Sequence, residues 1–124
     1  MIDTHTIIWF IEGNKALSEQ AKTILTDYSN FCEVSILSLW KISIKFNIGK
    51  LKTEHNLQEF IELTEKFWRI NNNITKKSII TYQNLPLYHR DPFDRMLISQ
   101  AKTENLTIIT KDENFKKYDI EIVW

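Results

Sequence analysis

The chain has 124 residues, of which 43% are hydrophobic and 12% aromatic, with two Gly and two Pro. This composition excludes a disordered chain and fits a single folded domain over residues 1–124. Lys and Arg number 16, and so do Asp and Glu. The formal net charge is therefore zero, which excludes a protein that coats nucleic acid through a general basic excess.

Cys32 is the single cysteine. It excludes an intrachain disulfide and is typical of a cytoplasmic protein. Asp3 interrupts any early apolar run, so we expect no signal peptide. No segment approaches the roughly 20 apolar residues needed to cross a bilayer, so we expect no membrane association.

Hydrophobic spacing and capping residues predict alternating strands and helices. The first half contains a short strand at 1–4, a helix near 7–11 that ends at Gly13-Asn14, a helix capped by Ser18, a strand at 31–35, and a helix opened by Ser38 and ended by Gly49. The second half contains a helix at 57–64, a short strand at 67–70, a helix capped by Thr75 and stopped by Pro86, a helix near 92–101, a strand at 106–110 and an edge strand at 120–124. This alternation predicts an α/β fold with a parallel sheet and helices on both faces.

The clearest helix start lies in residues 88–101. Asp91 is a good N-cap, and Pro92 suits the first helical position, where a missing N–H costs nothing. Asp94 comes three residues after the cap, where its carboxylate can reach back to the cap's own N–H. Phe93, Leu97 and Ala101 then recur every four residues, which predicts a buried stripe. Asp94 is therefore expected beside a buried face, either as part of a capping box or as part of a site.

Three aspartates map to the carboxyl edge of the predicted sheet, where sites form in open α/β folds. Asp3 ends the first strand, Asp112 follows the strand at 106–110, and Asp94 lies at a helix N-terminus. Gathered carboxylates repel one another, so a proton or a hard divalent cation must compensate them. Such a metal site activates water and clamps a phosphodiester. The alternatives are a solvated strand end for Asp3, a capping box for Asp94 and a turn residue for Asp112.

In combination these features resemble the PIN-domain family, and within it the VapC-like toxins of bacterial toxin–antitoxin pairs. The matching segments are Ile2-Asp3-Thr4-His5, Val34-Ser35, residues 38–45, Gly49-Lys50-Leu51, Leu85-Pro86, residues 89–95, residues 106–112, Phe115 and Tyr118. The resemblance implies a three-layer α/β/α sandwich around a parallel sheet, and RNA cleavage that depends on Mg²⁺ or Mn²⁺. It also implies a homodimer and inhibition by a cognate antitoxin.

The resemblance also assigns roles to individual residues. Asp3, Asp94 and Asp112 match the family's catalytic, metal-binding acids. Thr110 matches a polar residue near the metal, and Asp91 has an outer-shell or capping role. Only Met1 and Ile2 precede Asp3, so we expect residues upstream of Met1 to complete the short first strand.

Lys41 is the main departure from the family, whose second acid belongs at this position. The change is two charge units at a site where neighbouring charges interact by roughly 4 kcal/mol at an effective dielectric constant near 20. We predict that Lys41 pairs with Asp3 or Asp94, substitutes for a cation, and lowers metal affinity and nuclease rate. The alternative is that Lys41 extends its ammonium group away into solvent.

The sequence therefore predicts a metal-dependent endoribonuclease of the PIN/VapC type that is impaired by Lys41. The alternative is an inactive PIN-like module that dimerises and binds an antitoxin peptide or RNA. A phospho-accepting receiver domain is disfavoured, because it needs an Asp at the end of its central strand, where this chain has Val34-Ser35 or Ile70-Asn71.

Overall fold

The computed structural model describes all residues, 1–124, and contains six α-helices, four short strands and one 3₁₀ helix. The helices are α1 (Thr4–Ile11), α2 (Glu19–Thr26), α3 (Ile36–Asn47), α4 (Leu57–Phe67), α5 (Lys76–Asn84) and α6 (Pro92–Glu104). The strands are β1 (Glu33–Ser35), β2 (Arg69–Asn71), β3 (Ile108–Ile109) and β4 (Ile122–Val123), and the 3₁₀ helix η1 spans Phe115–Lys117. None of the helices is long and apolar enough to span a bilayer.

The sheet is parallel throughout, as the sequence predicted. β1 pairs with β2 and β3 pairs with β4, both in parallel register. Ile2 joins the two pairs, since it forms parallel bridges to Val34 on one side and to Ile109 on the other. The order across the sheet is therefore β2, β1, Ile2, β3, β4. The predicted first strand is reduced to this central bridge.

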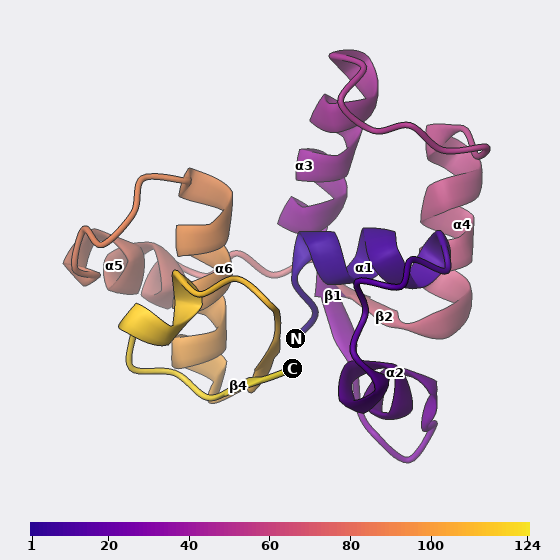
Figure 1. Cartoon of the computed structure of the whole chain (residues 1–124). Coiled ribbons are helices and arrows are strands. Elements are labelled where there is room, and N and C mark those ends of the chain that lie inside the picture. The colour runs from indigo at the N-terminus through magenta and orange to yellow at the C-terminus, as the bar shows by residue number, and fades with distance from the viewer.

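Two apolar cores lie on opposite faces of this sheet. Ile2 and Ile109 belong to one core, whereas their chain neighbours Met1 and Ile108 belong to the other. Because successive strand residues point to opposite faces, this alternation places helices on both sides of the sheet. Figure 1 shows α5 and α6 on one side and α1 to α4 on the other. The predicted three-layer α/β/α arrangement is confirmed.

Local signals explain most helix starts. The side chains of Ser18 and Thr75 accept the N–H groups of Ala21 and Ser78, as predicted for N-caps. The predicted start of the third helix at Ser38 is wrong. Ser35, the last residue of β1, caps α3 by accepting the N–H of Leu37, and Ser38 lies buried inside the helix. Because α3 follows β1 without a loop, Lys41 is carried close to the edge of the sheet.

Candidate acidic site

The N-terminus of α6 provides two of the acids. Asp91 caps the helix, and its Oδ1 accepts the N–H groups of Phe93 at 2.9 Å and of Asp94 at 3.0 Å. The predicted return contact from Asp94 to the cap does not form, so the capping-box alternative for Asp94 is wrong. The Asp94 carboxylate turns instead toward α3, and the second oxygen of Asp91 is also free to do so.

Lys41 of α3 binds both of these acids. Its Nζ lies 2.7 Å from Asp94 Oδ1 and 2.9 Å from Asp91 Oδ2. The Lys41 side chain is only 12% exposed, so it does not extend into solvent. The predicted ion pair with Asp94 is therefore present, and the pair with Asp3 is not. Asp91 is a second partner that the sequence reasoning did not foresee.

Burial and the contacts among the three groups shift the pKa of each. Burial opposes the charged form of Lys41, but the hydrogen bonds and charges of Asp94 and Asp91 outweigh it and raise the pKa of Lys41. Burial also raises the pKa of Asp91, yet the backbone N–H of Asp94 and the bond from Lys41 outweigh burial and lower it. For Asp94, burial is the largest cause and raises the pKa, because Lys41 offsets it only in part.

Asp3 is buried at the start of α1. It is 3% exposed, and its Oδ2 accepts a hydrogen bond from Thr110 Oγ1 at 3.1 Å. Burial and then the charge of Asp94 raise the pKa of Asp3 to about 7, with only partial relief from Thr110. Asp3 is therefore buried rather than a solvated strand end, and it lies within the electrostatic reach of Asp94.

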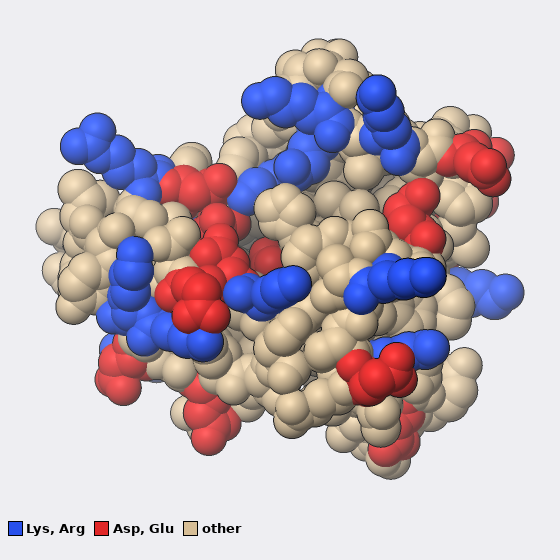
Figure 2. All heavy atoms as spheres, viewed as in Figure 1, with Lys and Arg blue, Asp and Glu red and all other residues tan.

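Asp112 reaches the same edge through Thr110. The N–H of Asp112 donates to Thr110 Oγ1 at 3.0 Å, so one hydroxyl contacts both Asp3 and Asp112. Asp112 Oδ1 accepts the N–H of Asn114 at 2.8 Å, which is the turn role named as its alternative. Figure 2 shows acidic side chains gathered between α6 and the α1–α3 side of the molecule, with basic side chains along the border.

The arrangement does not fit tight binding of a divalent metal ion. The structure contains no group of three or more His, Cys, Asp or Glu side chains placed to hold one. An ammonium group already bonds one oxygen of Asp94, and a pKa near 7 leaves Asp3 partly protonated at neutral pH. The structure thus brings the acids to one edge but does not assemble them as a ligand set, so the roles of Asp3, Asp94 and Asp112 as metal ligands stay predictions.

Three further side chains border the site. His89 Nε2 lies 3.8 Å from Asp94 Oδ2, and its Nδ1 lies 2.9 Å from the hydroxyl of Tyr118. Arg95, 5% exposed, donates to that hydroxyl at 3.2 Å and to the carbonyl of Pro86 at 2.7 Å. All three side chains lie in segments that matched the family, but no pattern in the sequence indicates their mutual contact.

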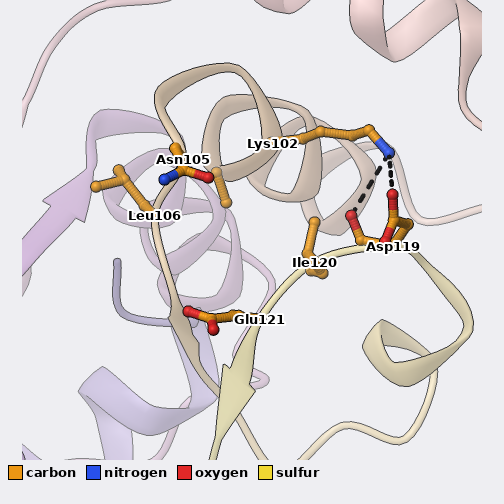
Figure 3. Close-up of a pocket in the computed structure, with 7 residues that line it drawn as sticks. Lys102, Asn105, Leu106, Asp119, Ile120 and Glu121 are labelled. Carbon is orange, nitrogen blue, oxygen red and sulfur yellow. Dashed lines mark hydrogen bonds and ion pairs between the residues drawn. The ribbon is translucent and has the colours of Figure 1, made fainter.

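A second pocket lies at the far end of α6, where Figure 3 shows the ion pair between Lys102 and Asp119 at its rim. Asp94 and Lys102 are eight residues apart on α6, which is about 12 Å at 1.5 Å per residue, so this pocket is separate from Asp94. Both side chains of its ion pair are exposed, by 42% and 99%. It offers no buried charge, and we assign it no part in the site.

The comparisons with known proteins agree with this architecture. Residues 1–121 match a family model described as "PIN domain". The fold is similar to a chain in the crystal structure of VapBC2 from Rickettsia felis bound to a DNA fragment from their promoter, with a TM-score of 0.73. The two chains are 17% identical over 99% of this chain and 96% of the other. A search of curated proteins gave no match.

Proposed function

The chain belongs to the PIN-domain family, and we propose that it is a VapC-like member whose endoribonuclease site is restrained by its own lysine. In this proposal Lys41 stands where a divalent Mg²⁺ or Mn²⁺ ion would otherwise balance the acids. RNA cleavage is then far slower than at a site with a full set of carboxylates. The observation that carries the proposal is the double ion pair of Lys41 with Asp91 and Asp94.

Electrostatics supports this reading of Lys41. A divalent cation brought to Asp94 would meet an ammonium group held within 3 Å of the same carboxylate. Like charges about 4 Å apart repel by roughly 4 kcal/mol per pair of unit charges at an effective dielectric constant near 20. A metal ion that binds beside Lys41 is destabilised by this repulsion. A metal ion that displaces Lys41 breaks the two hydrogen bonds of Lys41 to Asp91 and Asp94. Both routes lower metal affinity.

RNA cleavage by the purified wild-type protein, with and without Mn²⁺, tests the proposed activity. We expect slow, Mn²⁺-dependent cleavage that the Asp94→Asn variant abolishes, since Asp94 is the acid on which the site is centred. Lys117→Gln, an exposed surface change, serves as the control for preparation effects and keeps the wild-type rate. Cleavage that persists in Asp94→Asn contradicts the assignment of this site.

The alternative function is an inactive module that binds RNA or an antitoxin. The same double ion pair favours it, because the ammonium group of Lys41 already binds the Asp94 oxygen that a metal would need. Wild-type protein that cleaves no RNA at any Mn²⁺ concentration, yet retains RNA in a binding assay, would select this alternative. The VapBC2 structure contains DNA from its promoter, and an antitoxin partner for the present chain is part of our proposal.

We also propose that the chain forms a homodimer through an apolar groove between α3, α5 and α6. Its lining is almost wholly apolar: Leu37, Trp40, Ile74, Tyr82, Pro92, Phe93 and Met96. Trp40 is 59% exposed there, although tryptophans are usually buried. Ile79, 52% exposed, continues the apolar face of α5 because it is three residues before Tyr82. An apolar surface of this kind favours a protein partner.

The mass in solution tests this dimer. We expect the wild type to elute with about twice its chain mass of 14.8 kDa. Ile79→Asp places a charge on the apolar face, so the variant should elute as a monomer, as measured by light scattering. Tyr28→Asp is the matched control, since Tyr28 is an exposed aromatic residue on the loop after α2. A monomeric wild type, or a dimeric Ile79→Asp variant, contradicts the proposed interface.

A further inference from the structure

One buried polar atom next to the site has no partner. His89 Nε2 is buried and makes no hydrogen bond, and it is the one such side-chain atom in the structure. It faces Asp94 Oδ2 across 3.8 Å, beyond hydrogen-bond distance. A buried nitrogen without a partner costs free energy, so its position calls for an explanation.

The contacts on the other side of the ring determine which nitrogen carries the proton. Arg95 has only donors, so its Nη1–H must donate to the Tyr118 oxygen, 3.2 Å away. The Tyr118 hydroxyl proton then has one acceptor, His89 Nδ1 at 2.9 Å. A neutral imidazole that accepts at Nδ1 carries its proton at Nε2. The N–H therefore points toward the Asp94 carboxylate.

The surroundings of this network hold it rigidly. Arg95 also donates to the carbonyl groups of Pro86 at 2.7 Å and Leu85 at 3.2 Å, and it stacks over the ring of Tyr82 at 5.0 Å. Tyr118 is 5% exposed and packs edge-on against His89, with ring centroids 5.5 Å apart. Because the Arg95 guanidinium group is buried among carbonyl oxygens, it cannot rotate freely. It therefore holds the Tyr118 hydroxyl in place, and the hydroxyl in turn orients the His89 imidazole.

We propose that Arg95, Tyr118 and His89 are positioning residues for Asp94. Lys41 holds Oδ1 of this carboxylate from one side, and the Nε2–H of His89 faces Oδ2 from the other. The hydrogen bond from Lys41 and the longer-range attraction of the Nε2–H across 3.8 Å together favour one orientation of the carboxylate, independently of any metal. The inference rests on the proposed function only in taking Asp94 as the central acid of the site.

The tautomer of His89 tests the network in the wild-type protein. In a two-bond ¹H–¹⁵N correlation spectrum, recorded where the imidazole is neutral, we expect His89 to show a protonated Nε2 and an unprotonated Nδ1. Its signals are assigned by their loss in His89→Gln, since the chain has only two other histidines, His5 and His55. A protonated Nδ1 on His89 in the wild-type spectrum overturns the proposal.

Removal of the hydroxyl tests the positioning role. In Tyr118→Phe we expect a mixture of His89 tautomers and a displaced ¹³C carboxyl resonance of Asp94. Tyr88→Phe is the matched control and leaves both signals unchanged, because the Tyr88 ring packs on Tyr118 but its hydroxyl makes no hydrogen bond within the protein. In His89→Gln the amide group carries N–H donors whether or not Tyr118 has its hydroxyl. Adding Tyr118→Phe to His89→Gln should therefore not move the Asp94 resonance further.

Two results contradict the positioning role. One is a Tyr118→Phe spectrum with the wild-type tautomer of His89. The other is an Asp94 resonance that moves equally whether histidine or glutamine occupies position 89. Neither signal depends on RNA cleavage, so the failure of this inference is distinguishable from the failure of the proposed nuclease function.

Discussion

Replacement of Lys41 by Glu is expected to give the protein a metal site and to raise Mn²⁺-dependent RNA cleavage at least 100-fold above the wild type. The variant removes the ammonium group that binds Asp94 and Asp91 and adds a carboxylate beside them. A 100-fold change corresponds to about 2.7 kcal/mol, whereas one pair of charges at this range contributes roughly 4 kcal/mol. The charge change is therefore large enough for the expected gain.

The stability of the Lys41→Glu variant should depend on metal, unlike that of the wild type. Without a metal, the new carboxylate repels Asp94 and Asp91, so the variant unfolds at a lower temperature than the wild type. Mn²⁺ at about 100 times its Kd adds about 2.7 kcal/mol. For a domain of this length that raises the Tm by roughly 10 °C. Thermal melts in EDTA and in Mn²⁺ measure the difference.

Lys41→Gln is the control for this experiment. It removes the positive charge without supplying a carboxylate, so we expect a gain in Mn²⁺ affinity and a metal-dependent rise in Tm that are both smaller than those of Lys41→Glu. Equal, tight Mn²⁺ binding by the wild type and Lys41→Glu would show that Lys41 does not restrain the site. A Lys41→Glu variant that still fails to bind Mn²⁺ would lead to the same conclusion.

Asp3→Asn is expected to stabilise the protein at pH 8 by up to about 4 kcal/mol and to have little effect near pH 4. Burial and the charge of Asp94 raise the pKa of Asp3 from 3.8 to about 7 in the folded state. Below pH 3.8 both states keep the proton. As the pH rises from about 4 to 7, the unfolded state releases its proton first, so stability falls. Each pKa unit of this difference amounts to 1.36 kcal/mol.

Urea unfolding at pH 4.5, 6 and 8 measures this effect, and the amide introduced by Asp3→Asn retains an oxygen that can accept the Thr110 hydroxyl. The matched control is Asp27→Asn, because hydrogen bonds from Ser29 lower the pKa of Asp27 on the exposed surface. We expect Asp27→Asn to have the opposite effect, a small loss of stability at pH values above the pKa of Asp27 in the folded protein. Curves for Asp3→Asn and the wild type that stay parallel across the pH range would contradict the buried, partly protonated state of Asp3.

Much of the fold could be predicted because its signals are local. Asp91, Pro92 and the apolar stripe after them predicted α6, and Asp91 does cap it. The start of α3 was placed three residues too late because Ser35 and Ser38 are equally good caps in the sequence. Only the packing of β1 directly against α3 distinguishes them.

The site was predictable in its charges but not in its geometry. The positive charge of Lys41 among acids predicted an ion pair, and the pair with Asp94 is present. The bond to Asp91 was missed, because a capping aspartate uses one oxygen for the helix and the sequence does not show where the other points. The contact of His89 with Tyr118 joins residues 29 apart and depends on side-chain direction alone.

The most direct test of Lys41 as the site's cation is anomalous scattering from wild-type crystals soaked in Mn²⁺. We predict no anomalous peak at Asp94, with the Lys41 side chain in density between Asp91 and Asp94. Soaked crystals of Lys41→Glu should show a peak at the same place. A manganese peak bound to Asp94 in the wild type, with Lys41 displaced, would contradict the account.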